Sequence, residues 1–230
     1  MRNTFRSFAF SLVLPVLLIG GLSSFAQESS ENTVELQFVN SVQFGFHELD
    51  VFLSNGDGTV RRVTPDTPLS SLYEPLYTTS DLSDADRMGV SDAAFNPRMQ
   101  GIELGVTLAE WLPATGTATY TVEGDTATLE AEFSGLIPNG TYTLWCSVNV
   151  LEVMIPVDEP CGAVDGSEAS IIVDENGSAT YIVEMPALPG STEDALTLLS
   201  VAYHSDGQTY GASPGEFGGN THVQIYAVVP

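Results

Sequence analysis

The stretch TATYTVEGDTATLEAEF, residues Thr117–Phe133, decides the fold class. Its second half alternates strictly, so that threonine and glutamate occupy one set of positions and apolar residues the other. The apolar set is Ala127, Leu129, Ala131 and Phe133. Successive side chains of a strand point to opposite faces, so this strand has one dry face and one wet face, as antiparallel sheets require. Gly124 lies between the two halves and can adopt the positive φ of a tight hairpin turn.

Further short runs of this kind, bounded by Gly, Pro, Asn or Asp, extend along the chain and bring the expected number to about eleven strands. They are Thr33–Val39, Phe44–Leu53, Thr59–Val63, Ile102–Leu108, Thr117–Val122, Thr126–Phe133, Thr141–Val150, Ala169–Val173, Ala179–Glu184, Ala195–Tyr203 and His222–Val228. With no convincing long helix, the pattern predicts an all-β fold, an antiparallel β-sandwich of the Ig-like or jelly-roll-like kind.

The stretch Thr64–Gln100 differs from the rest, because it holds four prolines and no strand-like run. A short helical turn is predicted near Asp84–Met88, with Ser83 as its cap. We therefore expect a single β-sandwich domain over residues 27–230 that carries one long irregular insertion at about residues 64–100.

The first 26 residues have the pattern of a secretory signal peptide. Arg2 and Arg6 precede an apolar stretch, Leu12–Leu18, and Ser24-Phe25-Ala26 supplies a cleavage site with small residues. The alternative is a membrane anchor, but a bilayer span needs about 20 apolar residues. We expect a secreted or periplasmic protein with no membrane span in the mature chain.

The charge is strongly acidic, with 30 Asp and Glu against six Lys and Arg in the whole chain and a net charge of −24. All 30 acids follow Ala26, so removing Arg2 and Arg6 with the signal peptide takes −24 to −26. Such a surface repels nucleic acids and anionic lipids, so we expect both to be poor partners and no nucleic acid to be bound. The charge is explained either by a solvated acidic surface or by a role in storing or sensing cations.

Cys146 and Cys161 are the two cysteines of the chain. In an exported protein two cysteines most simply form a disulfide. The loop between them, of about 15 residues, would contribute about 3 kcal/mol in the chain-entropy model. A catalytic thiol would need cationic neighbours, and the apolar run around Cys146 offers none.

Two histidines near the C-terminus suggest a metal site. His204 and His222 are expected at strand ends bordering one long connection, which also holds Asp206 and Glu216. These four residues could bind a divalent cation if the connection folds back across its strands, although their spacing matches no zinc motif. Acidic loops at Asn55–Gly58, Asp81–Asp86 and Asp174–Gly177 are calcium candidates, but they lack the full EF-hand pattern and also suit ordinary Asx turns.

Catalytic motifs are missing from the sequence. No Gly-x-Ser-x-Gly occurs, and Ser205 would point away from the adjacent His204 on a strand. Paired carboxylates for glycoside hydrolysis stay open, because their separation in space decides that chemistry. Trp111, near Pro113 at a strand end, is the better candidate for an exposed sugar-stacking platform, whereas Trp145 has the setting of a core residue.

The segment AEFSGLIPNGTYTLWC, Ala131–Cys146, joins two strands through Gly-Leu-x-Pro-Asn-Gly. Together with the closing YHSDGQTYGASPGEFGGNTHVQIY, it resembles a group of uncharacterised secreted prokaryotic β-sandwich proteins. The resemblance runs from about Phe133 to the C-terminus and implies an extracytoplasmic sandwich, with no activity attached.

These observations favour a secreted, acidic, non-catalytic β-sandwich that binds a ligand or acts at the cell surface. One alternative is a metal-binding protein or metal-dependent enzyme using His204 and His222 with Asp206 or Glu216. A second is a carbohydrate-binding module with Trp111 in its platform. The ligand is left open, with a glycan or another cell-surface partner among the possibilities.

Overall fold

The computed structural model of the chain describes residues 32–45, 51–80, 98–150 and 155–230. These residues form thirteen strands and three short helical segments, and every strand pair is antiparallel. The predicted all-β class is thus confirmed, and the fold is sandwich-like. Glu31–Pro230 forms one compact unit. The predicted signal peptide, His47, the helical turn at 84–88 and the acidic loop at 81–86 lie outside the described residues.

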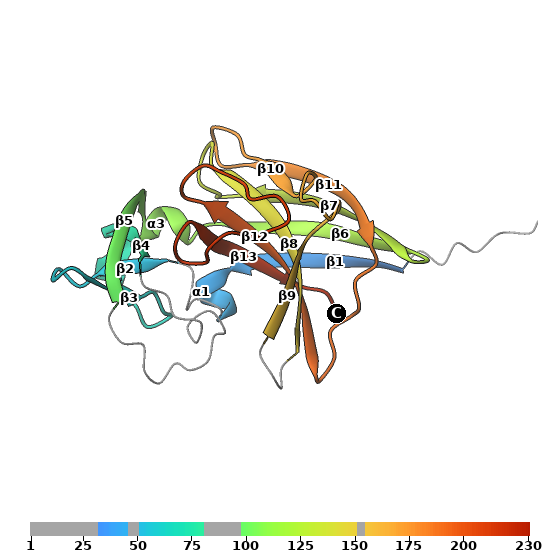
Figure 1. The fold of residues 1–230 in the computed structure, drawn as a ribbon, viewed down its shortest axis with the longest axis horizontal. Coiled ribbons are helices and arrows are strands. Elements are labelled where there is room, and N and C mark those ends of the chain that lie inside the picture. Colours follow the sequence, from blue (N-terminus) through green and yellow to red (C-terminus); the bar gives the residue numbers. More distant parts are fainter. Residues whose placement is uncertain (1–31, 46–50, 81–97, 151–154) are drawn as a thin grey trace, which may run out of the picture. The chain divides into compact units, whose positions relative to one another are not determined.

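The larger sheet has nine strands. Eight follow the order β10-β8-β12-β13-β1-β6-β7-β11, and the ninth, β9, pairs with a different part of β8 than β10 does. Figure 1 labels these strands on the ribbon. Their bounds are β1 Asn32–Asn40, β6 Thr115–Glu123, β7 Thr126–Ser134, β8 Thr141–Val150, β9 Ile155–Pro160, β10 Ser170–Ile172, β11 Ala179–Pro186, β12 Ala195–His204 and β13 Thr221–Val228.

The hairpin of β6 and β7 forms as the sequence pattern predicts. Gly124 adopts a φ of +65°, and the pairing runs from Glu123 opposite Thr126 to Thr115 opposite Ser134. On β7 the residues Ala127, Leu129, Ala131 and Phe133 are buried, while Glu130 and Glu132 are exposed. The alternation therefore gives this strand its register, because a slip of one residue would expose the whole apolar set.

The sheet curls so that its two end strands, β10 and β11, lie near each other (Figure 1). The concave side encloses the main core, to which strands far apart in the order contribute Leu36, Leu129, Leu144 and Leu199. Phe38 meets Phe133 edge to face, with 5.2 Å between the ring centroids. A single curled sheet thus supplies both walls of the sandwich-like core.

A second, four-stranded sheet closes into a small barrel in the order β2-β3-β5-β4. Its strands are β2 Phe52–Ser54, β3 Thr59–Arg62, β4 Pro75–Thr79 and β5 Arg98–Thr107, and the 3₁₀ helix η1 (Leu69–Tyr73) precedes β4. The expected insertion at 64–100 is therefore not wholly irregular. The first residue of a strand can be proline, since its missing N–H is not needed there. Pro75 begins β4 in this way, and its presence made the segment look like a loop in the sequence.

Two short helices connect the sheets, α1 (Ser41–Phe44) and α3 (Leu108–Trp111). Asn40 ends β1 and caps α1, since its side-chain oxygen accepts a 2.9 Å bond from the Val42 N–H. The strand expected over residues 44–53 is consequently wrong at its start. Helix α3 opens with a capping box between Thr107 and Glu110.

The arginines that the structure describes all lie in the small barrel. Among the described residues the arginines are Arg61 and Arg62 on β3 and Arg98 on β5, and the chain contains no lysine. Arg61 donates to the Glu74 carboxylate over 2.7 Å. The larger sheet, from β6 onward, therefore carries acidic residues with no lysine or arginine among them.

Candidate functional site

The ends of β12 and β13 hold the two histidines of the predicted metal site. In this antiparallel pair Tyr203 is opposite His222, and His204 is opposite Thr221. Residues directly opposite each other share a face, and successive residues point to opposite faces. His204 and His222 consequently lie on opposite faces of the sheet and cannot bind the same ion in this arrangement.

His204 belongs to a buried chain of hydrogen bonds. The Trp145 Nε1–H donates to Thr143 Oγ1 over 2.7 Å, and Thr143 Oγ1 lies 2.7 Å from His204 Nε2. Thr143 Oγ1 thus links the indole to the imidazole, and on the other side of the ring His204 Nδ1 lies 3.4 Å from Thr221 Oγ1. Burial lowers the pKa of His204, and the charge of Asp206 only partly opposes this. The ring is a neutral structural group.

His222 lies on the other face and is fully buried. Its Nε2 is 3.0 Å from Ser205 Oγ, and its ring centroid is 6.4 Å from that of Tyr203. The sequence analysis expected Ser205 to point away from His204. It did not predict the contact between Ser205 and His222, because that contact depends on the register between the two strands. A Ser–His contact is one element of nucleophilic catalysis, which also needs an open hydroxyl and an oriented base. Ser205 Oγ is also 3.4 Å from the Asn220 carbonyl oxygen.

Asp206 and Glu216 lie in the connection between β12 and β13, and both are exposed. The Asp206 carboxylate accepts bonds from the Tyr210 hydroxyl and, over 3.1 Å, from the Gln208 N–H. Asn220 holds the connection from within, since it donates to Tyr210 Oη over 2.7 Å and accepts from the Glu216 N–H over 2.8 Å. Within the described residues, no group of three or more His, Cys, Asp or Glu could hold a metal ion.

The two described acidic loops use their carboxylates in their own turns. Asp57 Oδ1 accepts from the Thr59 hydroxyl over 2.5 Å and from the Thr59 N–H over 3.0 Å. Asp174 Oδ1 accepts from the N–H groups of Ser178 and Asn176, each over 2.8 Å. These hydrogen bonds hold the pKa of both aspartates below its usual value. The loops are thus built as Asx turns.

Trp111 is not exposed, contrary to the expectation of a sugar-stacking platform. Its side chain has 0% exposure on α3, and its ring meets that of Tyr203 edge to face at 6.1 Å. Its carbonyl oxygen accepts bonds from Asn40 Nδ2 over 3.2 Å and from Gln224 Nε2 over 2.9 Å. Helix α3 turns this residue into the core, so it offers no surface on which a sugar could stack.

Gln224 is a buried polar residue that the sequence did not reveal. A bulge in the pairing of β12 with β13 places it between Val223 and Ile225, which pair with Ala202 and Val201. The Tyr142 hydroxyl donates to Gln224 Oε1 over 2.5 Å and accepts from the Ile137 N–H over 2.8 Å. We call Tyr142, Gln224, Ile137 and the Trp111 carbonyl the core network. Burial raises the pKa of Tyr142, which keeps its hydroxyl protonated as a donor.

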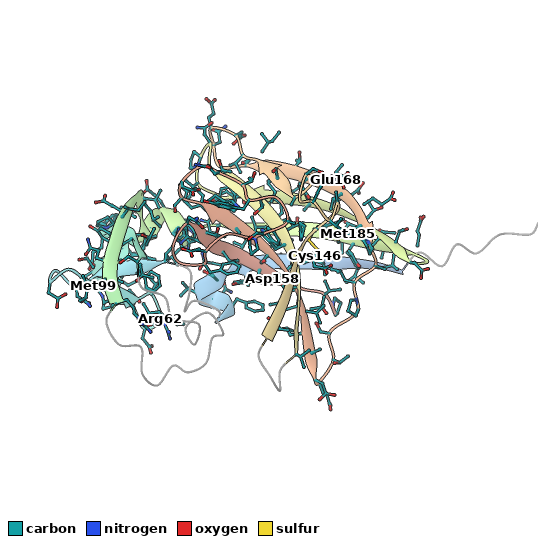
Figure 2. The ribbon with its side chains drawn as sticks, viewed as in Figure 1. Arg62, Met99, Cys146, Asp158, Glu168 and Met185 are labelled. Atoms are coloured by element: carbon teal, nitrogen blue, oxygen red, sulfur yellow. A yellow bond between two sulfur atoms is a disulfide. The ribbon has the colours of Figure 1, made fainter. Side chains whose placement is uncertain are left out.

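The predicted disulfide between Cys146 and Cys161 is confirmed, with Cα atoms 5.3 Å apart. Cys146 lies on β8, and Cys161 follows β9 directly, where Glu159 pairs with Cys146. Cys146 Sγ lies 3.5 Å from Met185 Sδ, and both residues are labelled in Figure 2. The disulfide thus fastens the edge strand β9 to the core. Two prolines, Pro156 and Pro160, concealed β9 in the sequence.

A groove of about 350 Å³ lies where the two ends of the curled sheet approach each other. We call it the seam groove, and Glu168 at its rim is labelled in Figure 2. Its lining comes from β10, β11 and the turn before β10, and consists of Glu168, Ser170, Ile172, Thr180, Tyr181, Ile182, Val183 and Glu184. The Tyr181 hydroxyl donates to the Glu168 carbonyl oxygen over 2.5 Å and so joins the two sides.

Two isoleucines make the seam groove unusual. Ile172 is 88% exposed and Ile182 is 70% exposed, although both lie among acidic neighbours. The sequence analysis did not single them out. The sequence nevertheless contained a signal for them. In the strand Thr126–Phe133 the positions that point to solvent hold threonine or glutamate, whereas Ile172 and Ile182 occupy the corresponding positions of their own strands.

No protein-family model matches the chain, and no curated protein sequence is significantly similar to it. None of the helices in the described part of the chain combines the length and the hydropathy that crossing a bilayer requires.

Proposed function

We propose that the chain is a secreted or periplasmic, acidic, non-catalytic binding protein, and that the seam groove is its binding site. The observation that carries this proposal is the exposure of Ile172 and Ile182 in the groove at the ends of the curled sheet. Both isoleucines line one groove, and apolar side chains gathered at one place on a soluble protein are characteristic of a site that another molecule covers.

The surroundings of the histidines support a binding role over a metal-dependent one. His204 is held by Thr143, His222 contacts Ser205, and the two rings point away from each other. Both rings are buried, and the hydrogen bonds around His204 stabilise the ends of β12 and β13. The disulfide is consistent with an extracytoplasmic location, where cysteine pairs persist.

The proposal is tested by incubating the purified mature protein with ester, glycoside and peptide substrates, with and without added divalent cations. We expect no turnover above the buffer rate and no labelling of Ser205 by a fluorophosphonate probe. The control is Ser205→Ala, which removes the hydroxyl that contacts His222. Turnover that is lost in this variant would establish a hydrolase and overturn the proposal.

A further inference from the structure

We propose that the seam groove binds a linear amphiphilic amine, with its ammonium head between Glu168 and Glu184 and its alkyl tail over Ile182 and Ile172. This inference rests on the proposed binding function and names the class of its ligand. It is drawn from the register of the two strands, from the floor of the groove, and from the order of apolar and acidic side chains along it.

The first support is the register of the two sides of the groove. Residues 173–178 join β10 to β11, and the Asp174 N–H donates to the Ser178 carbonyl oxygen over 2.9 Å. Counting away from this pair along both sides, the exposed residues come level as Ile172 with Thr180, Ser170 with Ile182, and Glu168 with Glu184. The groove is therefore apolar towards the turn and acidic at its other end.

The second support is the floor of the groove. Tyr181 and Val183 are buried and alternate with the exposed residues of β11. The Tyr181 hydroxyl donates to the Glu168 carbonyl oxygen, so β10 and β11 are held together beneath the groove and no strand fits between them. Burial and then the negative charge of Glu168 raise the pKa of Tyr181, which keeps this hydroxyl protonated as a donor. The occupant therefore lies on top of the seam, and a single alkyl chain is narrow enough to do so.

The third support is the apolar surface that a tail would cover. Ile182 and Ile172 are largely exposed and line the groove from opposite sides. They are offset by two residues along the strands, about 7 Å, so one extended chain reaches both. The groove volume of about 350 Å³ lies within the range of small-molecule sites, about 300–1,000 Å³. A tail in this position would remove both isoleucines from water.

The fourth support is charge. Glu168 and Glu184 come level at one end of the groove, and on β7 Glu130 lies directly opposite Ile182. All three belong to the part of the chain after Arg98, which contains no lysine or arginine. The field along the groove is thus negative, which attracts an amine and repels a fatty acid of the same length. A second copy of this chain fits poorly, since it would bring the same carboxylates face to face.

The test is isothermal titration calorimetry of the full mature protein with octylamine at neutral pH and low ionic strength. Octanoate is the charge control, and the diamine of the same chain length tests the orientation of head and tail. Ile182→Thr removes apolar surface without changing the charge, and its matched control is Val164→Thr, at an exposed valine outside the groove lining. Glu184→Gln removes charge at the head, and its matched control is Glu193→Gln, at an exposed glutamate before β12.

We expect octylamine to bind, the diamine to bind more weakly and octanoate not to bind. Each methylene added between butylamine and octylamine should tighten binding about twofold, because an open groove buries only part of each group. Ile182→Thr should weaken octylamine binding about fivefold and Glu184→Gln about tenfold, and each control variant less than about twofold.

Three results would overturn the proposal. Equal weakening by a variant and its matched control would show diffuse attraction to an acidic surface and overturn the groove assignment. Tighter binding of the diamine would place a charge at the Ile172 end and overturn the order of head and tail. Absence of octylamine binding, equal binding of octanoate, or a dimer that Ile182→Thr dissociates would overturn the choice of ligand. The turnover test of the proposed function is unaffected by any of these results.

Discussion

Tyr142→Phe is the sharpest test of the core network. The Tyr142 hydroxyl accepts a bond from the Ile137 N–H and donates one to Gln224 Oε1, and Tyr142 and Gln224 are both fully buried. Phenylalanine keeps the ring and removes only the oxygen. The variant therefore leaves one buried donor and one buried acceptor without a partner.

The magnitude follows from those two atoms. A buried polar group left unsatisfied costs about 1–3 kcal/mol, so the free energy of unfolding should fall by about 2–6 kcal/mol. For a domain of this size each kcal/mol lowers the Tm by about 2–4 °C, so the Tm should fall by at least about 4 °C.

Urea denaturation and thermal unfolding of the two proteins measure this loss. The matched control is Tyr181→Phe, which removes a hydroxyl that donates to the carbonyl of an exposed residue, Glu168, where water can take its place. The control should lose only about 0.5–1.5 kcal/mol. If Tyr142→Phe lost no more than the control, the core network would contribute no special stability and the reasoning would fail.

Three further predictions concern stability. The double substitution Cys146→Ala/Cys161→Ala should cost about 3 kcal/mol in urea denaturation under oxidising conditions, and an unchanged midpoint would contradict the disulfide's role. Burial raises the pKa of Asp158 above its unfolded value, although the hydrogen bond from the Ser147 hydroxyl opposes this. Ionised Asp158 therefore destabilises the fold, and the variant Asp158→Asn should be more stable than the parent at neutral pH. That advantage should vanish below about pH 4, where both states are protonated, and a pH-independent difference would refute it. Burial lowers the pKa of His204, so the free energy of unfolding of the parent should decrease as the pH falls below about 6.5. The variant His204→Gln should lose less stability over that range, and parallel curves of unfolding free energy against pH would contradict this.

The fold could be predicted where local pattern determines structure. The strand over residues 126–133 alternates without a break, and its hairpin has Gly124 at the turn, so both the strand and its pairing were readable. The strands β4 and β9 were missed because Pro75, Pro156 and Pro160 make them resemble loops. Edge strands and first positions accept proline, since the missing N–H is not needed there. The order of strands in the sheet was not readable, because it depends on long-range packing.

The candidate site was harder to predict, because it depends on which face each side chain takes. The sequence placed His204 and His222 correctly at the ends of two paired strands. Their opposite orientation follows from the register, where Tyr203 rather than His204 is opposite His222. Trp111 was misplaced for a similar reason, since the capping box of α3 turns it inward. The seam groove arises only when the sheet curls and brings β10 near β11.

The distribution of arginine along the chain has a consequence for proteolysis. Trypsin-like proteases cut after lysine or arginine, and the chain offers none between Met99 and Pro230. None of the nine strands of the larger sheet, β1 included, therefore contains a cleavage site for this class of enzyme. The same lack of lysine leaves the amino terminus as the one primary amine of the chain, so amine-reactive labels would mark a single defined position.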